Sequence, residues 1–100
     1  IERIRACHKA VLPPLVIDCS HGNSSKNPLL QTSVLQQIIA ERSETDVRGV
    51  MLESHLVDGN QAISCNMIYG QSVTDGCLGW DKTSALLLSV AEQMRYECVV

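Results

Sequence analysis

The sequence is poor in aromatic side chains and in positive charge. It contains no Phe, one Trp and two Tyr among 100 residues. A core must therefore be built from aliphatic side chains, which bury less area each than aromatic rings do. The formal net charge is −3 at pH 7, and no broad basic face of the kind that binds phosphate backbones is evident. Nucleic acid is therefore not an expected partner.

Long apolar runs and paired cysteine motifs are also missing. No stretch approaches the roughly 20 apolar residues that cross a bilayer, and the opening IERIRACHKA lacks the apolar segment of a secretory signal. The cysteines are odd in number and never spaced as Cys-x-x-Cys, which argues against a disulfide framework or a zinc ribbon. They are Cys7, Cys19, Cys65, Cys77 and Cys98. We expect a soluble, cytoplasmic protein with reduced thiols and no membrane partner.

The apolar residues that are present, 45% of the chain, predict one globular unit with alternating helices and strands. The opening segment has helical spacing up to Pro13 and Pro14, which end it. The short apolar run at 14–19 predicts a buried strand. Asn27 followed by Pro28 is typical of a helix start, and an apolar stripe extends that helix over 28–43.

The second half predicts a strand, a long loop and a helix. Val50, Met51 and Leu52 form a compact apolar run that ends at Glu53, which predicts a second strand. Residues 58–81 are rich in Gly and polar side chains, so we expect a long loop, and loops of this length are often functional. Residues 81–96 carry a helical apolar stripe. This order indicates an α/β fold with a parallel sheet.

Two buried strands alone leave unpaired backbone groups along both edges of the sheet. We therefore expect either that copies of the chain assemble, as a homo-oligomer, or that the chain is a piece of a larger domain.

Ionisable side chains gather just after the predicted strands, where the carboxyl ends of parallel strands share a crevice. His21 follows the first strand, Glu53 closes the second, and Asp75 lies in a turn before Gly76. His55, two residues after Glu53, would share its face of the strand and could support it from a second shell. Each residue alone also has an ordinary structural interpretation, as a loop histidine, a solvated strand-end carboxylate or a turn aspartate.

The Ser-Ser-Lys run at residues 24–26 also has two interpretations. It could present free backbone donors to an anion at a helix start, or it could form a plain turn, which is the more frequent case.

Three segments, taken together and in order, resemble the C-terminal motifs of metal-dependent 3-deoxy-D-arabino-heptulosonate-7-phosphate (DAHP) synthases of the feedback-regulated bacterial and fungal type. The segments are DCSHGNSSK, GVMLESHLVDGNQ and QSVTDGCLGW. The resemblance extends at motif level from Leu15 to Trp80, whereas the flanking helices match only in pattern.

The resemblance implies a TIM (β/α)8 barrel that condenses phosphoenolpyruvate with erythrose 4-phosphate, the first step of aromatic amino-acid synthesis through the shikimate pathway. It implies a divalent metal held by a Cys, a His, a Glu and an Asp, the last three being His21, Glu53 and Asp75. That donor set suits Mn, Fe, Co or Zn and does not choose among them. The two strands would be the seventh and eighth of the barrel, with helices six to eight.

A whole barrel needs roughly 250 residues, so residues 1–100 would form one incomplete domain. The family's Cys ligand, and the Lys and Arg residues that hold the substrate phosphates, would lie in the part of the barrel that this sequence does not include. We therefore expect the isolated chain to be inactive. Two alternatives stay open: a non-catalytic, oligomerising α/β module that keeps a vestigial metal site, and a small metallohydrolase built on the same three residues.

Overall fold

The structure is a computed structural model that describes residues 14–97, with side chains described up to Arg95. The helix expected over the opening segment lies outside the described residues. The strands are β1 Leu15–Asp18, β2 Val47–Met51, β3 Ser54–His55 and β4 Leu78–Gly79. The α-helices are α2 Gln31–Ala40 and α3 Trp80–Glu97, and 3-10 turns span η1 His21–Ser24, η2 Pro28–Leu30 and η3 Arg42–Glu44.

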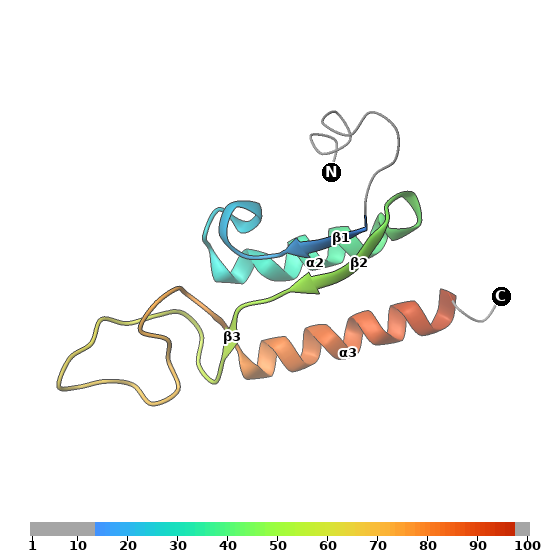
Figure 1. Ribbon diagram of the computed structural model, residues 1–100. Coiled ribbons are helices and arrows are strands. Elements are labelled where there is room, and N and C mark those ends of the chain that lie inside the picture. The colour runs from blue at the N-terminus through green and yellow to red at the C-terminus, as the bar shows by residue number, and fades with distance from the viewer. Residues whose placement is uncertain (1–13, 98–100) are drawn as a thin grey trace.

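β1 and β2 form a parallel pair that α2 connects (Figure 1). Asp18 pairs with Met51 at the end of the ladder, and the amide of Cys19 extends it by donating to the Met51 carbonyl at 2.8 Å. The α/β fold class and the parallel pairing predicted from the sequence are both confirmed.

The core lies between the two helices and the strands. Its buried apolar side chains are Cys19, Leu35, Ile38, Ile39, Leu78 and Leu86. α2 supplies three of them from one face, while Gln36 and Gln37 on the opposite face are exposed. α2 and α3 also contact each other directly. The core is thus small and aliphatic, as the composition predicts.

The helix predicted over 28–43 is divided into three pieces. The Asn27 side chain accepts a hydrogen bond from the Leu29 amide at 3.1 Å, and Pro28 follows it in the 3-10 turn η2. α2 then begins at Gln31. At the other end, the Arg42 guanidinium donates to the carbonyl of Ile39, so a side chain satisfies an acceptor that the ending helix leaves without a partner.

β2 ends at Met51, two residues before Glu53, so Glu53 does not close the strand as predicted. The chain then enters a second small sheet, in which Ser54 of β3 pairs in parallel with Leu78 of β4. The long segment between these strands is mostly irregular, as expected, and isolated bridges join Gly59 to Cys77 and Asn60 to Ser72. Glu53 therefore lies at the break between two sheets.

Each sheet in the described part of the chain has two strands, so the outer edges of β1 and β2 have no strand beside them. Val16 on β1 is 71% exposed and the other residues of this strand are only partly buried, so the prediction of a buried strand is wrong for the described chain, in which no further strand or helix covers this face. The open edges expected from the sequence are therefore present in residues 14–97. No helix in this range has the length and apolar character that crossing a membrane would require.

Candidate metal centre

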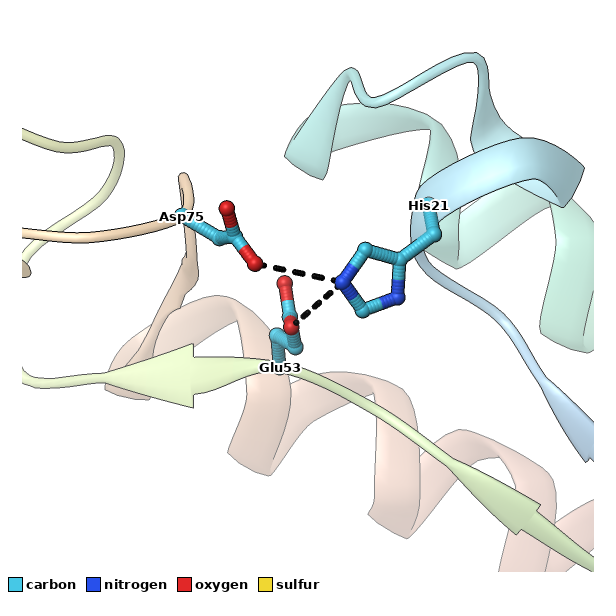
Figure 2. A group of neighbouring side chains, drawn as sticks. All are labelled: His21, Glu53 and Asp75. Atoms are coloured by element: carbon cyan, nitrogen blue, oxygen red, sulfur yellow. Dashed lines mark hydrogen bonds and ion pairs between the residues drawn. The ribbon is translucent and has the colours of Figure 1, made fainter.

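Three side chains from distant segments meet at the carboxyl end of the β1–β2 pair. Nε2 of His21 lies 3.2 Å from Oε1 of Glu53 and 3.1 Å from Oδ2 of Asp75. One ligand atom from each residue lies within 4.8 Å of the other two. Figure 2 shows the imidazole pointing between the two carboxylates. The structure thus brings together the three residues that the sequence singled out.

Neighbouring parallel strands explain this convergence. β1 and β2 run in the same direction, so the residues that follow them lie at the same end of the pair. His21 comes just after β1, and Glu53 comes just after β2. Asp75 arrives from the loop that leads into β4, and β4 is anchored to the same region by its pairing with β3. Figure 2 shows Asp75 approaching from the side opposite to His21.

Asp18 fixes the orientation of the imidazole. Its Oδ2 lies 2.8 Å from Nδ1 of His21, and the Ser20 hydroxyl is also 2.8 Å from that nitrogen. Asp18 is itself held because its Oδ1 accepts from the Ser20 amide at 2.8 Å. With Nδ1 engaged, Nε2 is the nitrogen that faces the carboxylates. An imidazole held in this way by a carboxylate is typical of metal-ligating histidines.

The electrostatics follow from these contacts. The Asp18 hydrogen bond, then that of Asp75 and the nearby charge of Glu53, raise the pKa of His21 above its usual value. The hydrogen bond from the Ser20 side chain, followed by that of His21, lowers the pKa of Asp18. A cation between the carboxylates, whether a proton on His21 or a metal ion, relieves their mutual repulsion.

Sequence reasoning did not single out Asp18. The available signal was its position three residues before His21, at the last position of the strand. His55, which was expected as the supporting residue, is exposed in β3, and its Nδ1 accepts a hydrogen bond from the Leu56 amide at 2.8 Å. His55 is not part of the convergent group.

The Ser-Ser-Lys run forms a turn rather than an anion cradle. Ser25 and Lys26 both have left-handed backbones, with φ of 53° and 61°. Their amides donate to the carbonyls of Gly22 and His21 respectively, so these donors are used within the turn. Lys26 nevertheless lines the open cavity above the cluster, together with Asn60 and Gly76.

The donor set, and the two spacings measured from Nε2 of His21, fit a divalent transition-metal ion. Bonds of about 2.1 Å to an ion place adjacent ligand atoms about 3.0 to 3.4 Å apart in octahedral or tetrahedral coordination. The separations from Nε2 of His21, 3.1 and 3.2 Å, fall within that range. One imidazole nitrogen and two carboxylate oxygens suit Mn, Fe, Co or Zn.

Comparison with known proteins places these features in a family. Residues 1–88 match the model of the DAHP synthetase I family. The chain is 42% identical over 96 residues to a tyrosine-inhibited phospho-2-dehydro-3-deoxyheptonate aldolase of Schizosaccharomyces pombe, covering 87% of this chain and 26% of that protein. It is 43% identical over 93 residues to the Phe-sensitive enzyme of Escherichia coli K12, covering 88% and 27%.

A solved structure agrees with these sequence matches. The phospho-2-dehydro-3-deoxyheptonate aldolase of Francisella tularensis SCHU S4 superposes with a TM-score of 0.79 at 40% identity, over 91% of this chain and 29% of that chain. The chain therefore spans about a quarter to three tenths of the length of these relatives. The resemblance found in the three motifs is confirmed, and the chain belongs to the DAHP synthetase I family.

Proposed function

We propose that this chain is the metal-binding C-terminal part of a DAHP synthase, which condenses phosphoenolpyruvate with erythrose 4-phosphate. The observation that carries the proposal is the convergence of His21, Glu53 and Asp75 at the carboxyl end of the β1–β2 pair. The family match over residues 1–88 supports the same reaction and does not favour a non-catalytic module.

Each residue of the centre has a distinct role in the proposal. His21 presents Nε2 because Asp18 occupies Nδ1. Glu53 supplies Oε1 from the break between the two sheets, and Asp75 supplies Oδ2 from the exposed loop. When bound, a divalent ion would act as a Lewis acid, polarising the aldehyde carbonyl of erythrose 4-phosphate or activating a water.

The rest of the reaction needs groups from elsewhere in a barrel, of which β1 and β2 would be strands seven and eight. Both substrates are phosphorylated, and fixed cations are required to hold such anions. Lys26 is the permanent cation among the residues that line the cavity. We therefore propose that the isolated chain, as one incomplete domain, binds metal but has no synthase activity. Homo-oligomeric assembly and a cytoplasmic location are part of the same proposal.

Metal titration of the chain tests the centre. Co²⁺ should bind and give visible absorption bands, and His21→Ala, Glu53→Ala and Asp75→Ala should each weaken binding at least tenfold. His55→Ala is the matched control because this histidine lies outside the group, and it should bind as the wild type does. Equal affinity in all five proteins would show that these residues are not the ligands.

A chimera tests the reaction. The chain would replace the corresponding segment of the Phe-sensitive E. coli enzyme, and consumption of phosphoenolpyruvate in the presence of erythrose 4-phosphate would be followed. We expect activity that His21→Ala abolishes and His55→Ala leaves in place. A folded, metal-loaded chimera without turnover would contradict the synthase assignment. Metal-dependent hydrolysis of a simple phosphate ester by the chain would instead support the metallohydrolase alternative.

A further inference from the structure

Glu53 occupies a position where the regular backbone ladder is interrupted. The pairing of β1 with β2 ends at Asp18 and Met51, and the pairing of β3 with β4 starts at Ser54 and Leu78. On the β4 side, the Leu78 amide donates to the Glu53 carbonyl at 2.8 Å. β1 ends at Asp18, so in the described part of the chain its register with β2 does not extend to Glu53.

The side chain of Gln31 makes two hydrogen bonds to the backbone of Glu53. Its Nε2 donates to the Glu53 carbonyl at 3.1 Å, and its Oε1 accepts from the Glu53 amide at 2.8 Å. Gln31 is the first residue of α2 and is 0% exposed. A primary amide offers one donor and one acceptor side by side, as a peptide group does. Gln31 therefore pairs with Glu53 much as a neighbouring strand would.

We infer that Gln31 is a positioning residue for the metal centre and acts through the backbone of Glu53. The inference rests on the proposed function, in which Glu53 is a ligand. Although Gln31 lines the cavity, both of its polar atoms are used by Glu53. Its effect on an ion is therefore indirect: it fixes the peptide from which the carboxylate projects. Residues that hold ligands in this way typically change metal affinity 10 to 100-fold when they are replaced.

The chemistry of the pair predicts which replacements fail. Methionine fills a similar volume but leaves the partly buried amide of Glu53 without an acceptor, which favours rotation of that peptide toward water. Asparagine keeps the amide group but is one methylene shorter, so it cannot span the same gap. Both changes release the Glu53 backbone while leaving all three ligand side chains in the sequence.

The test compares four variants of the full 100-residue chain with the wild type, using Co²⁺ as the probe. Gln31→Met and Gln31→Asn should bind Co²⁺ about 10 to 100-fold more weakly and should show faster hydrogen exchange of the Glu53 amide by NMR. Gln37→Met makes the same change on the exposed face of α2 and should alter neither readout. Leu35→Ala, which opens a cavity in the core, is the control for lost stability and should keep the Co²⁺ affinity.

The outcomes separate the two proposals. If the wild type binds Co²⁺ and either folded Gln31 variant binds it equally well, Gln31 is not a positioning residue, whereas the metal centre stands. If Leu35→Ala weakens binding as much as the Gln31 variants, the effect is one of general stability and the inference is overturned. If the wild type does not bind Co²⁺, the proposed centre and this inference both fail.

Discussion

Oδ2 of Asp18 lies 2.8 Å from Nδ1 of His21, and this contact determines which ring nitrogen faces Glu53 and Asp75. The carboxylate accepts a hydrogen bond from Nδ1–H, which leaves the Nε2 lone pair directed at the cluster in the neutral imidazole. The geometry of the centre therefore depends on a residue that is not one of the three proposed ligands.

Replacement of Asp18 by Asn should weaken metal binding about 10 to 100-fold, because the ring loses its charged partner. It should also lower the pKa of His21, since the Asp18 hydrogen bond is the largest cause of the raised value. Titration with Co²⁺ and NMR titration of the imidazole protons measure the two effects. Asp46→Asn is the control, because Asp46 pairs with Arg48. An unchanged His21 pKa in Asp18→Asn would contradict the assigned contact.

The stability of the metal-free chain should fall as the pH rises above about 6.5. The pKa of His21 is raised in the folded chain by Asp18, Asp75 and Glu53. Protonated His21 therefore contributes stability that is complete below its unfolded pKa of about 6.5, and this contribution is lost as the pH rises through the folded pKa. Urea unfolding from pH 5.5 to 9 with EDTA measures the trend. His21→Gln should remove it.

Metal affinity should change in the opposite direction over the same pH range. A proton and a metal ion compete for Nε2 of His21, so Co²⁺ binding should strengthen as the pH rises and should release a proton. Calorimetry in buffers of different ionisation enthalpy counts that proton. Binding without proton release near pH 6.5 would exclude His21 as a ligand.

A second carboxylate should control stability in acid. Asp58 pairs with Lys82 and accepts from the Gly79 amide at 2.5 Å, joining the start of the long loop to the start of α3. The Lys82 hydrogen bond, then that of Gly79, lowers the pKa of Asp58. Its contribution is thus complete above an unfolded pKa of about 3.9 and is lost as the pH falls through the folded value. Asp58→Asn should reduce the loss of stability between pH 5 and 2, measured by circular dichroism, whereas Asp46→Asn should not.

The long loop should not tolerate a side chain at Gly70. Its φ is +82°, and a Cβ there would lie 2.8 Å from Cβ of Leu56. Strain of this kind costs on the order of 1 to 3 kcal/mol, so Gly70→Ala should lower the unfolding midpoint in urea. Gly22→Ala is the matched control because a Cβ at that position has no atom within 4 Å. Equal midpoints would show that the loop relaxes without cost.

Local sequence patterns predicted most of the elements but not their junctions. The apolar stripe of α2 and the Asn27 cap are set by neighbours within a few residues, so spacing alone reveals them. The role suggested for His55 assumed a regular strand through Glu53 and on to residue 55. β2 instead stops at Met51 and β3 starts at Ser54. The alternation of side chains between the two faces of a regular strand therefore does not relate Glu53 to His55.

The supporting residues of the centre were harder to predict for a different reason. Gln31 and Glu53 are 22 positions apart. The role of a buried glutamine depends on which backbone groups lie within hydrogen-bond distance of its amide, and local sequence does not reveal them. The three proposed ligands could be located because they lie in recognisable motifs: His21 and Glu53 follow strand ends, and Asp75 lies in the loop that leads into β4. A neutral amide at the start of a helix gives no such signal.

His21 and Asp75 are 54 positions apart in the sequence, so a metal ion bound between them would also stabilise the folded chain. An ion shared by both residues would act as a reversible cross-link, because only the folded chain holds the ligands in place. Its occupancy would add stability in proportion to the logarithm of the free ion concentration. The melting temperature of such a protein would therefore report the concentration of free metal ion in its solution.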